Sequence, residues 1–491
     1  MNNLVIKTLV LFAWWSVACI YATSSQPRVA LGWGGGMGIY NPLNGDQILR
    51  NNFDLVDEDG LVNVPLYTSF IEPNSNSLLI SFDHYNTWFY NALTGLMIES
   101  EPDTKSLQTA CLLVKNNGEY EVVVPTRVGE IKAYNVITGT VSKDFAYLEH
   151  IGVSSLALFE NNGNFYVVAG TTSGFIDIYD YESGTLVHSI DVYQDGVNNG
   201  SWINTVVVFK DGDTVKVVAS TSVNPVPTNS GQIACWDLNT YQKIYCVDFA
   251  EKVNRDKFYN DGDTYAILLY KDIDGSLKMV VPGWDSEGVI KIWDAVTGKC
   301  VKKLYAEQFK DTTILPVKAF ESNGVIKLIV GYYSGYLAVW NTQTGQLEAS
   351  VYQNENVPRN ISKIIRAISI FEVDGIKYCT VGNDNGDVYT WQLDTLEPVV
   401  NWSAGQDCSI SANVCSQNLL ENPEKSQLGF FSLMMGCNIP VADLSNFAII
   451  SADNSHNSVF KVLINEDRSI QVNEDRSIQA SEQQAAWCQI L

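Results

Sequence analysis

The feature that most constrains this chain is a short pattern that recurs eight times. An aromatic residue is followed directly by Asn, Asp or Gln, then by Thr, Ser or Asn four positions after it and usually by Gly five positions after it. The eight aromatic residues are Tyr40, Tyr90, Tyr134, Tyr179, Trp236, Trp293, Trp340 and Trp391. A pattern that recurs eight times along one chain indicates an array of similar units that bury a common core by packing on their neighbours.

Each repeat also carries the signals of several short strands. Apolar, β-branched runs such as Val167–Gly170 and Leu328–Gly331 lie upstream of the aromatic residue. Asn-Gly turns stand 16 residues before it, for example at Gly163 and Gly324. Apolar runs of this kind predict strands, and glycine supplies the positive φ that tight hairpins need. We therefore expect each unit to consist of four strands joined by three turns.

Segments such as Gly288–Gly298 and Gly335–Gly345, with Trp-Asp or Trp-Asn followed by Thr-Gly, resemble WD40 repeats. The resemblance extends over residues 28–400 and implies an all-β fold, a β-propeller of about eight four-stranded blades. WD40 blades often place a histidine in a hydrogen-bonded set with the tryptophan, and none of the 4 histidines here falls at a repeated position. The chain thus resembles the divergent part of the WD40 and quinoprotein-like propeller family.

The seam of the expected ring is less regular than its body. The first repeat begins at Arg28 and lacks an innermost strand, and the pattern blurs after Trp402. Apolar runs return at 430–435, 447–451 and 459–463, and these could complete the first blade. We expect eight blades with a composite closing blade, with seven or nine as alternatives. The propeller would then span residues 28–463, followed by a polar tail at 464–491.

The N-terminus has the layout of a secretory signal peptide. One lysine, Lys7, precedes the apolar run Thr8–Ala18, and small residues follow it. The sequence therefore predicts a signal peptide at residues 1–22 and a secreted or periplasmic protein. A membrane-anchored protein, or an effector delivered into another cell, is the alternative. No later run is long and apolar enough to predict a stable membrane span.

The last four residues, Cys488 to Leu491, match the outline of a prenylation signal. Gln489 stands where that signal normally has an aliphatic residue. In addition, prenyltransferases act in the eukaryotic cytosol, and an exported chain leaves that compartment. No basic run stands nearby to reinforce a single lipid. We therefore expect Cys488 to be unmodified.

The charge balance is strongly acidic, with 31 Lys and Arg against 55 Asp and Glu, a formal net charge of −24. Binding of nucleic acid requires clustered basic residues that displace phosphate counterions. The sequence contains no such cluster, so nucleic acid is not an expected partner.

Two groups of cysteines are candidates for disulfides in an oxidising compartment. Cys235 and Cys246 flank a turn and are expected to face each other across a hairpin. Cys408, Cys415 and Cys437 lie close together in the less regular C-terminal region.

No pattern in the sequence predicts a catalytic, metal or cofactor site. Quinoprotein dehydrogenases share the Thr-Gly turn, but their repeats usually carry a docking Trp a few positions later. The positions four residues after the turn hold other residues here: Glu99, Lys143, His188, Lys302 and Ala349. The run Asp272–Gly275 resembles the start of a calcium loop, although the later ligands are missing and a hairpin turn explains it.

The candidate binding residues lie in loops between the second and third strands of the repeats, which share one face of the expected ring. They are Trp33, Tyr85, Arg127, Trp284, Tyr332 and Tyr333. Aromatic residues exposed on rigid loops are typical binding anchors. The repeated tryptophans are instead expected to be structural: Trp236, Trp293, Trp340 and Trp391.

Two functions fit these observations. The first is an exported, non-enzymatic platform that binds a protein or peptide partner on the loop face. The alternative is a propeller enzyme, a hydrolase, lyase or carbohydrate-active enzyme, with its site in the central channel. Converging carboxylates or a metal in the channel would favour the enzyme, and exposed loop aromatics would favour the platform.

Overall fold

The computed structural model consists of β-strands and one short 3-10 helix, η2 (Glu307–Phe309), in the residues that it describes. It describes strands within residues 29–125, most of 129–403, and the strands at 410–415, 441–443, 448–451 and 460–463. The main gaps within 129–403 are 147–151, 198–201, 223–229, 252–263, 284–287, 353–363 and 384–386. No helix in this described part is long and apolar enough to cross a membrane.

Six of the sheets are built from four strands that are consecutive in the chain. Their strands are β4 (Tyr67–Ile71), β5 (Leu78–Phe82), β6 (Thr87–Asn91) and β7 (Met97–Glu101); β12 (Val153–Asn161), β13 (Asn164–Thr171), β14 (Phe175–Asp180) and β15 (Leu186–Asp191); β16 (Trp202–Asp211), β17 (Thr214–Ser222), β18 (Gln232–Asp237) and β19 (Lys243–Asp248); β20 (Leu268–Lys271), β21 (Leu277–Val280), β22 (Ile290–Asp294) and β23 (Cys300–Leu304); β24 (Ile314–Ser322), β25 (Val325–Tyr332), β26 (Tyr336–Asn341) and β27 (Leu347–Tyr352); β28 (Ile365–Val373), β29 (Ile376–Asn383), β30 (Asp387–Gln392) and β31 (Pro398–Ser403).

The remaining strands combine the N-terminal region with the C-terminal region. A four-stranded sheet has the order β3 (Gln47–Asn52), β2 (Gly36–Tyr40), β1 (Val29–Trp33) and β32 (Ile410–Cys415). A five-stranded sheet has the order β11 (Val141–Asp144), β10 (Ile131–Asn135), β9 (Glu119–Pro125), β8 (Leu112–Asn116) and β33 (Val441–Asp443). The strands β34 (Ala448–Ser451) and β35 (Phe460–Leu463) form a hairpin.

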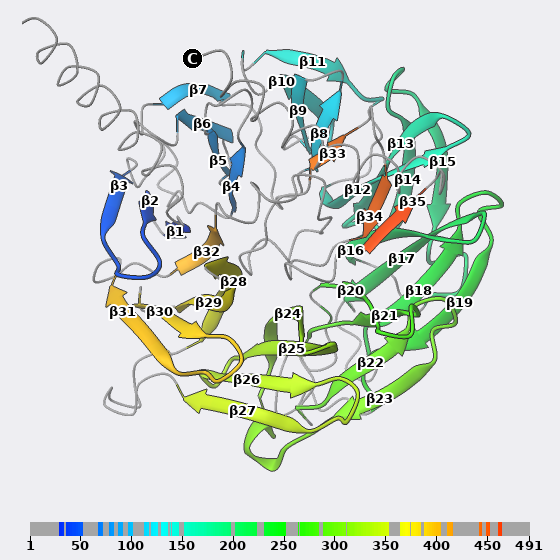
Figure 1. The fold of residues 1–491 in the computed structure, drawn as a ribbon. Helices are drawn as coiled ribbons and strands as arrows, with labels where there is room; N and C mark the ends of the chain where they lie inside the picture. Colours follow the sequence, from blue (N-terminus) through cyan, green and yellow to red (C-terminus); the bar gives the residue numbers. More distant parts are fainter. Residues whose placement is uncertain are drawn as a thin grey trace, which may run out of the picture.

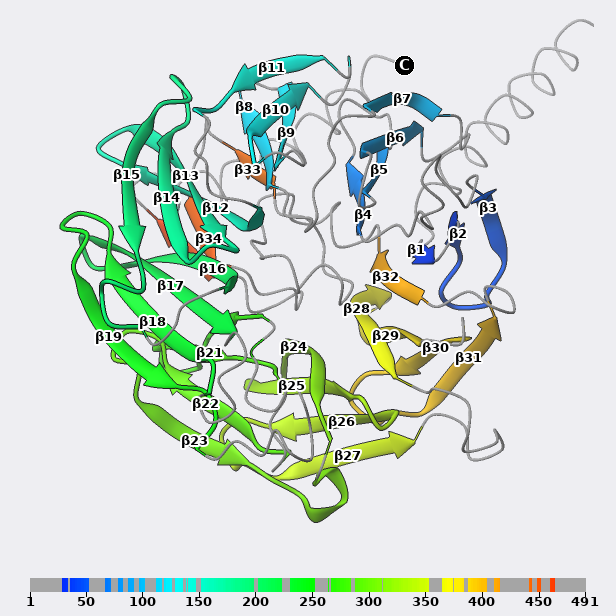
Figure 2. The same cartoon turned by 180° about the vertical axis from the view of Figure 1, so that it is seen from behind.

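The sheets stand side by side around a common axis, and the arrangement is a β-propeller-like all-β fold (Figures 1 and 2). The strands β4, β8, β12, β16, β20, β24, β28 and β32 lie toward the axis, and the last strand of each sheet lies at the rim. Because consecutive strands within each sheet pair antiparallel, the connection between its second and third strands lies at the same edge as the connection to the next sheet. We call this edge of the ring the loop face.

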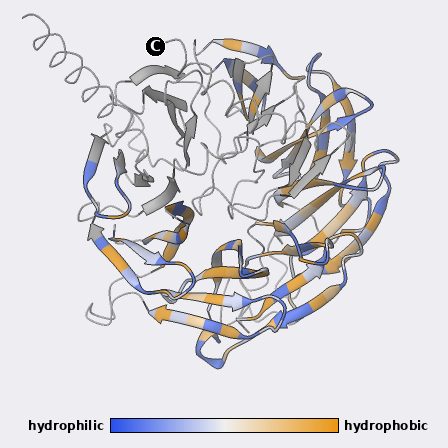
Figure 3. Cartoon of the chain, in the orientation of Figure 1, coloured by the Kyte–Doolittle hydropathy of each residue, from blue (hydrophilic) through white to orange (hydrophobic). Residues whose placement is uncertain are grey.

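The hydrophobic core lies between neighbouring sheets. The strand β16 is buried from Ile203 to Phe209, whereas the rim strand β19 has no buried residue. One apolar cluster joins the β12–β15, β16–β19 and β20–β23 sheets, so the middle sheet is covered on both faces. Figure 3 shows the hydrophobic residues along the strands and the hydrophilic residues at the turns. Radial packing therefore buries sheets that could not bury both faces alone.

The repeated turn explains why the sequence pattern recurs. In the β20–β23 sheet, Asp294 Oδ1 accepts hydrogen bonds from the backbone N–H of Thr297 at 3.0 Å and from its hydroxyl at 2.8 Å. Gly298 then adopts a φ of 69°. Where glycine is replaced, Tyr241 and Leu396 take the same left-handed conformation, with φ values of 60° and 54°. This conformation is costly for any residue with a Cβ, so the turn geometry is imposed by the surrounding sheet.

The repeated tryptophans are buried, as expected of structural residues. Trp236, Trp293, Trp340 and Trp391 have exposed fractions of 0 to 3%. The Trp236 indole N–H donates to Asp195 at 2.6 Å, across the boundary between two sheets. This chain lacks the repeated histidines that often bond to the tryptophan in WD40 blades. Here an aspartate from the connection between two sheets accepts the hydrogen bond of Trp236 instead.

Four rim strands also reach the turn of the next sheet, each through the residue four places after the glycine position of its own turn. Lys143 pairs with Glu182 at 2.9 Å, the His188 and Tyr241 rings stack at 3.8 Å, the Tyr245 hydroxyl donates to the Ala295 carbonyl at 2.8 Å, and Lys302 Nζ donates to the Thr342 carbonyl at 2.7 Å. Side chains other than Trp thus make the docking contacts at these positions.

Two expectations about the chain need correction. Cys235 lies opposite Tyr245 and Cys246 lies opposite Ala234, so the two thiols do not face each other, and both are free. The turn closes between Asp237 and Gln242, which sets this register, and neighbouring positions along a strand point to opposite faces of the sheet. The strand that completes the first sheet is β32, which pairs with β1, and not one of the later apolar runs. Cys408 and Cys437, and the run at 430–435, lie outside the described residues.

Candidate functional site: the loop face

Four aromatic side chains are strongly exposed in connections of the loop face. Tyr193, Trp202, Tyr305 and Tyr333 have exposed fractions of 62, 47, 46 and 41%. Tyr193 follows β15 and Trp202 begins β16, Tyr305 follows β23, and Tyr333 follows β25. By the antiparallel topology, all four positions lie at the edge that carries the connections between sheets. The exposed aliphatic residues lie elsewhere, mostly on the rim strands, as do Val187, Ile244, Val301 and Val399.

The connection that carries Tyr193 is a fixed turn. Asp191 Oδ1 accepts hydrogen bonds from the backbone N–H groups of Tyr193 at 3.0 Å and of Gln194 at 3.1 Å. Val192 and Val197 are buried on either side of this turn. A turn with buried anchors at both ends presents its exposed tyrosine with little freedom to lose on binding.

The connection that carries Tyr305 is fixed by the helix η2. Phe309 at the end of η2 is buried and stacks on Tyr332, with ring centroids 4.2 Å apart. Farther along the connection, the Thr313 carbonyl accepts a hydrogen bond from Tyr333 N–H at 2.9 Å. The backbones that carry Tyr305 and Tyr333 are therefore joined to each other.

Of the candidate binding residues, Tyr333 is exposed, and the expectation that Tyr332 is exposed is wrong. β25 continues through Tyr332, which pairs with Ile314 and is 0% exposed. Its hydroxyl accepts a hydrogen bond from the Trp340 indole N–H at 3.2 Å, and burial raises the pKa of this phenol far above its usual range. Tyr332 is therefore part of the core.

The other candidates are described only in part. Trp33 is the last residue of β1, where it pairs with Gly36, but its side chain lies outside the described residues. Tyr85, Arg127 and Trp284 also lie outside them. The binding role of all these residues stays a prediction.

Tyr193, Trp202 and Tyr305 were not predicted, because they lie outside the loops between the second and third strands. The connection from the fourth strand to the next sheet lies at the same edge. An aromatic residue directly after a fourth strand, or at the start of a first strand, was the signal that could have found them.

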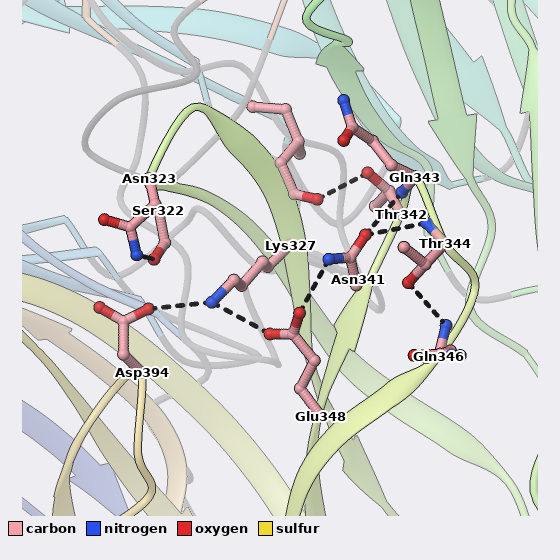
Figure 4. Close-up of polar contacts among 11 residues, drawn as sticks. Ser322, Asn323, Lys327, Asn341, Thr342, Gln343, Thr344, Gln346, Glu348 and Asp394 are labelled. Atoms are coloured by element: carbon pink, nitrogen blue, oxygen red, sulfur yellow. Dashed lines mark hydrogen bonds and ion pairs between the residues drawn. The ribbon is translucent and has the colours of Figure 1, made fainter.

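The opposite edge of the ring carries polar turns and ion pairs between sheets (Figure 4). Lys327 Nζ lies 3.0 Å from Glu348 and 3.3 Å from Asp394, which belongs to the next sheet. Asn341 Nδ2 also donates to Glu348, at 2.8 Å. Burial lowers the pKa of Lys327 and raises that of Glu348, but these contacts outweigh it, so the pKa of Lys327 is raised and that of Glu348 is lowered. The cluster joins two sheets and has its charges paired.

Polar side chains at the loop-face ends of the inner strands are also bonded between sheets. Ser154 donates to the carbonyl of Ile203 on the neighbouring inner strand. Asn204 Nδ2 lies 3.4 Å from the Thr264 hydroxyl, which donates to the Thr221 carbonyl at 3.1 Å. These hydrogen bonds hold adjacent sheets together.

Two buried cysteines lack the reactivity of a thiolate. Burial raises the pKa of the Cys235 thiol to about 12, and of the Cys379 thiol likewise to about 12, so neither is a thiolate near neutral pH. The described residues contain no group of three or more His, Cys, Asp or Glu side chains placed to hold a metal.

Comparison with known proteins supports the fold alone. No protein-family model matches the chain, and no curated protein matches it. Among solved structures, the dihydro-heme d1 dehydrogenase NirN shares 13% identity over 80% of this chain and 75% of its own, with a TM-score of 0.54. The computationally designed Ika8 protein shares 19% identity over 70% of this chain and 89% of its own, with a TM-score of 0.50. At such identities the likeness shows a β-propeller-like all-β fold alone.

Proposed function

We propose that this chain is an exported, non-enzymatic platform that binds a protein partner on its loop face. The observation that carries the proposal is the placement of Tyr193, Trp202, Tyr305 and Tyr333, which are exposed in connections of one edge of the ring. Tyr and Trp supply large contact areas and dominate the energetics of protein interfaces. The connections are fixed by buried anchors, which reduces the entropy lost on binding.

We further propose that the ring is a closed, WD40-type propeller of eight blades. Eight described sheets have four or more strands, and the pairing of β1 with β32 makes the first of them composite. Each of the five pairs in this ladder links the N-terminal region to the C-terminal region. Such a closure supports the rigidity that a binding surface needs, because it leaves no sheet free at the seam.

The alternative is an enzyme with a site in the central channel, and the NirN likeness shows that enzymes use related folds. Two observations favour the platform over it. Ser154, Asn204 and Thr264 are committed to bonds between sheets. In addition, the C-terminal strands β33, β34 and β35 lie beside inner strands of the ring, where a substrate would have to enter.

The experiment compares three forms of the chain starting at Thr23. The first is unchanged, the second carries Tyr193→Ser, Trp202→Ser and Tyr333→Ser, and the third carries Val187→Ser, Ile244→Ser and Val301→Ser on the rim. Each is immobilised and exposed to extract from the native source, and the affinity of the captured protein is then measured. We expect the loop-face variant to bind at least about 100-fold more weakly, since each anchor contributes about 1–2 kcal/mol.

The rim variant is the matched control and should bind like the unchanged chain. All three forms should melt within a few degrees of one another, because every substituted side chain is exposed. Equal binding by the loop-face variant would refute the proposed face.

A further inference from the structure

The five-stranded sheet contains one strand more than the other blades, and this strand comes from the C-terminal region. β33 pairs with β8, with Val441 opposite Leu113 and Asp443 opposite Lys115. This ladder is parallel, whereas the other described ladders are antiparallel. The strand is therefore an addition to a sheet that already has its four strands.

β33 covers an edge that faces the axis of the ring. β8 is the first strand of its sheet, and its other edge pairs with β9. An edge strand presents a row of N–H and C=O groups that can pair with an additional strand. Here residues 441–443 take up that position.

The pairing has the features of an exchangeable contact. It covers three residues, whereas the closing ladder between β32 and β1 covers five and is antiparallel. Parallel pairs are slightly less stable per residue. Pro440 stands directly before β33 in the sequence, and proline has no backbone N–H to donate.

The strands that follow keep this region close to the inner strands. β34 lies beside β12 and β16, and β35 lies beside β16 and β20. Figures 1 and 2 show β33 next to β8, and β34 and β35 farther along the ring next to β12 and β16. A strand held nearby by its own chain has a high effective concentration and can occupy a weak site.

We propose that the axial edge of β8 is a strand-addition site for an extended peptide, and that residues 441–443 occupy it in cis. An incoming peptide pairs through its backbone and displaces β33, so the C-terminal region restrains access to the site. This site is separate from the loop face, and its test does not depend on the partner proposed above.

The test is hydrogen exchange of the β8 backbone in the full-length protein. The variant carries Val441→Gly, Ala442→Pro and Asp443→Gly, which disfavour an extended, hydrogen-bonded strand. The control carries Asn473→Gly, Glu474→Pro and Asp475→Gly, farther along the C-terminal region. We expect β8 amides facing the axis to exchange about tenfold faster or more in the variant only, since they lose their acceptors. Exchange in β10 should be equal in all three proteins, which shows that the sheet is intact.

A synthetic peptide spanning residues 438–446 is then added to the variant. We expect it to restore slow exchange in β8 as its concentration rises. Equal exchange of β8 in the variant and the unchanged protein would overturn the cis occupancy. Fast exchange that the peptide does not slow would overturn the strand-addition site.

Discussion

At the scale of single residues, the neighbours Tyr332 and Tyr333 show how one step along the chain separates core from surface. Side chains alternate along a strand, and β25 extends one residue farther than the sequence pattern indicated. Tyr332 is buried against Phe309, and Tyr333 is 41% exposed. The sequence placed both in a loop because nothing in it marks where the strand ends. The exposure of Tyr333 is what a loop residue should have, but its binding role stays a prediction, and the exposed aromatics of the connections between sheets were not predicted.

The pair provides a matched prediction. Tyr332→Ala should lower the free energy of unfolding by about 3–5 kcal/mol, because it opens a cavity beside Phe309 and removes the acceptor of the Trp340 indole. Tyr333→Ala should change it by about 0.5 kcal/mol or less. Denaturant titrations of the two variants measure both values, and similar losses would show that Tyr333 also belongs to the core.

The turn carboxylate Asp294 predicts a dependence of stability on pH. Burial raises its pKa, but the bonds from Thr297 and from Lys278 outweigh this and hold it below the ordinary value of 3.8. Because the folded pKa is the lower one, the stabilisation is present above pH 3.8 and is lost as the pH falls through the folded pKa. Asp294→Asn keeps an acceptor for the turn and removes the charge. Its melting temperature should therefore fall less steeply than that of the unchanged protein below pH 3.8; parallel curves for the two proteins would contradict this.

At the scale of strands and turns, the repeat predicted the positions of the last turns, including the two without glycine. The periodicity located the strands well because each sheet has alternating apolar residues and a fixed turn chemistry. The register across the β18–β19 hairpin was predicted wrongly, as Cys235 and Cys246 show. The turn closes between Asp237 and Gln242 and the register shifts beside Trp236, and spacing along the sequence records neither feature.

The close approach of neighbouring sheets at the turns gives a second matched prediction. Gly298 and Gly163 both have positive φ, of 69° and 82°. A Cβ at Gly298 would lie 2.5 Å from the Tyr245 ring, whereas a Cβ at Gly163 would have no atom within 4 Å. Gly163→Ala should therefore cost about 1–2 kcal/mol from backbone strain alone, and Gly298→Ala about 1–3 kcal/mol more. Urea unfolding curves measure the difference; equal costs would mean that the contact between the two sheets yields without strain.

At the scale of the whole molecule, the sequence predicted an all-β, propeller-like ring but not the strand that completes its first sheet. Ile410–Cys415 is a short run with polar residues between apolar ones, and stronger apolar runs follow it. Its role depends on pairing with β1, about 380 residues away in the chain, and local pattern does not encode such pairing. The C-terminal runs at 447–451 and 459–463 contribute the hairpin β34–β35 instead.

Export of the whole molecule is also testable. If residues 1–22 are a signal peptide, the mature protein should begin at Thr23 and be recovered outside the cytoplasm. Mass spectrometry of the N-terminal peptide from the native source checks this. An intact N-terminus on cytoplasmic protein would contradict export. It would also remove one reason for expecting Cys488 to be free of a prenyl group.

Binding of the partner at the loop face can be measured by the hydrogen-exchange footprint of the captured complex. We predict slower exchange in the partner-bound form at residues 191–197, 305–313 and 333–335, with the turns around Asp294 and Asn341 unchanged. Protection confined to those opposite turns or to the rim strands, with the three loop-face segments unaffected, would contradict it.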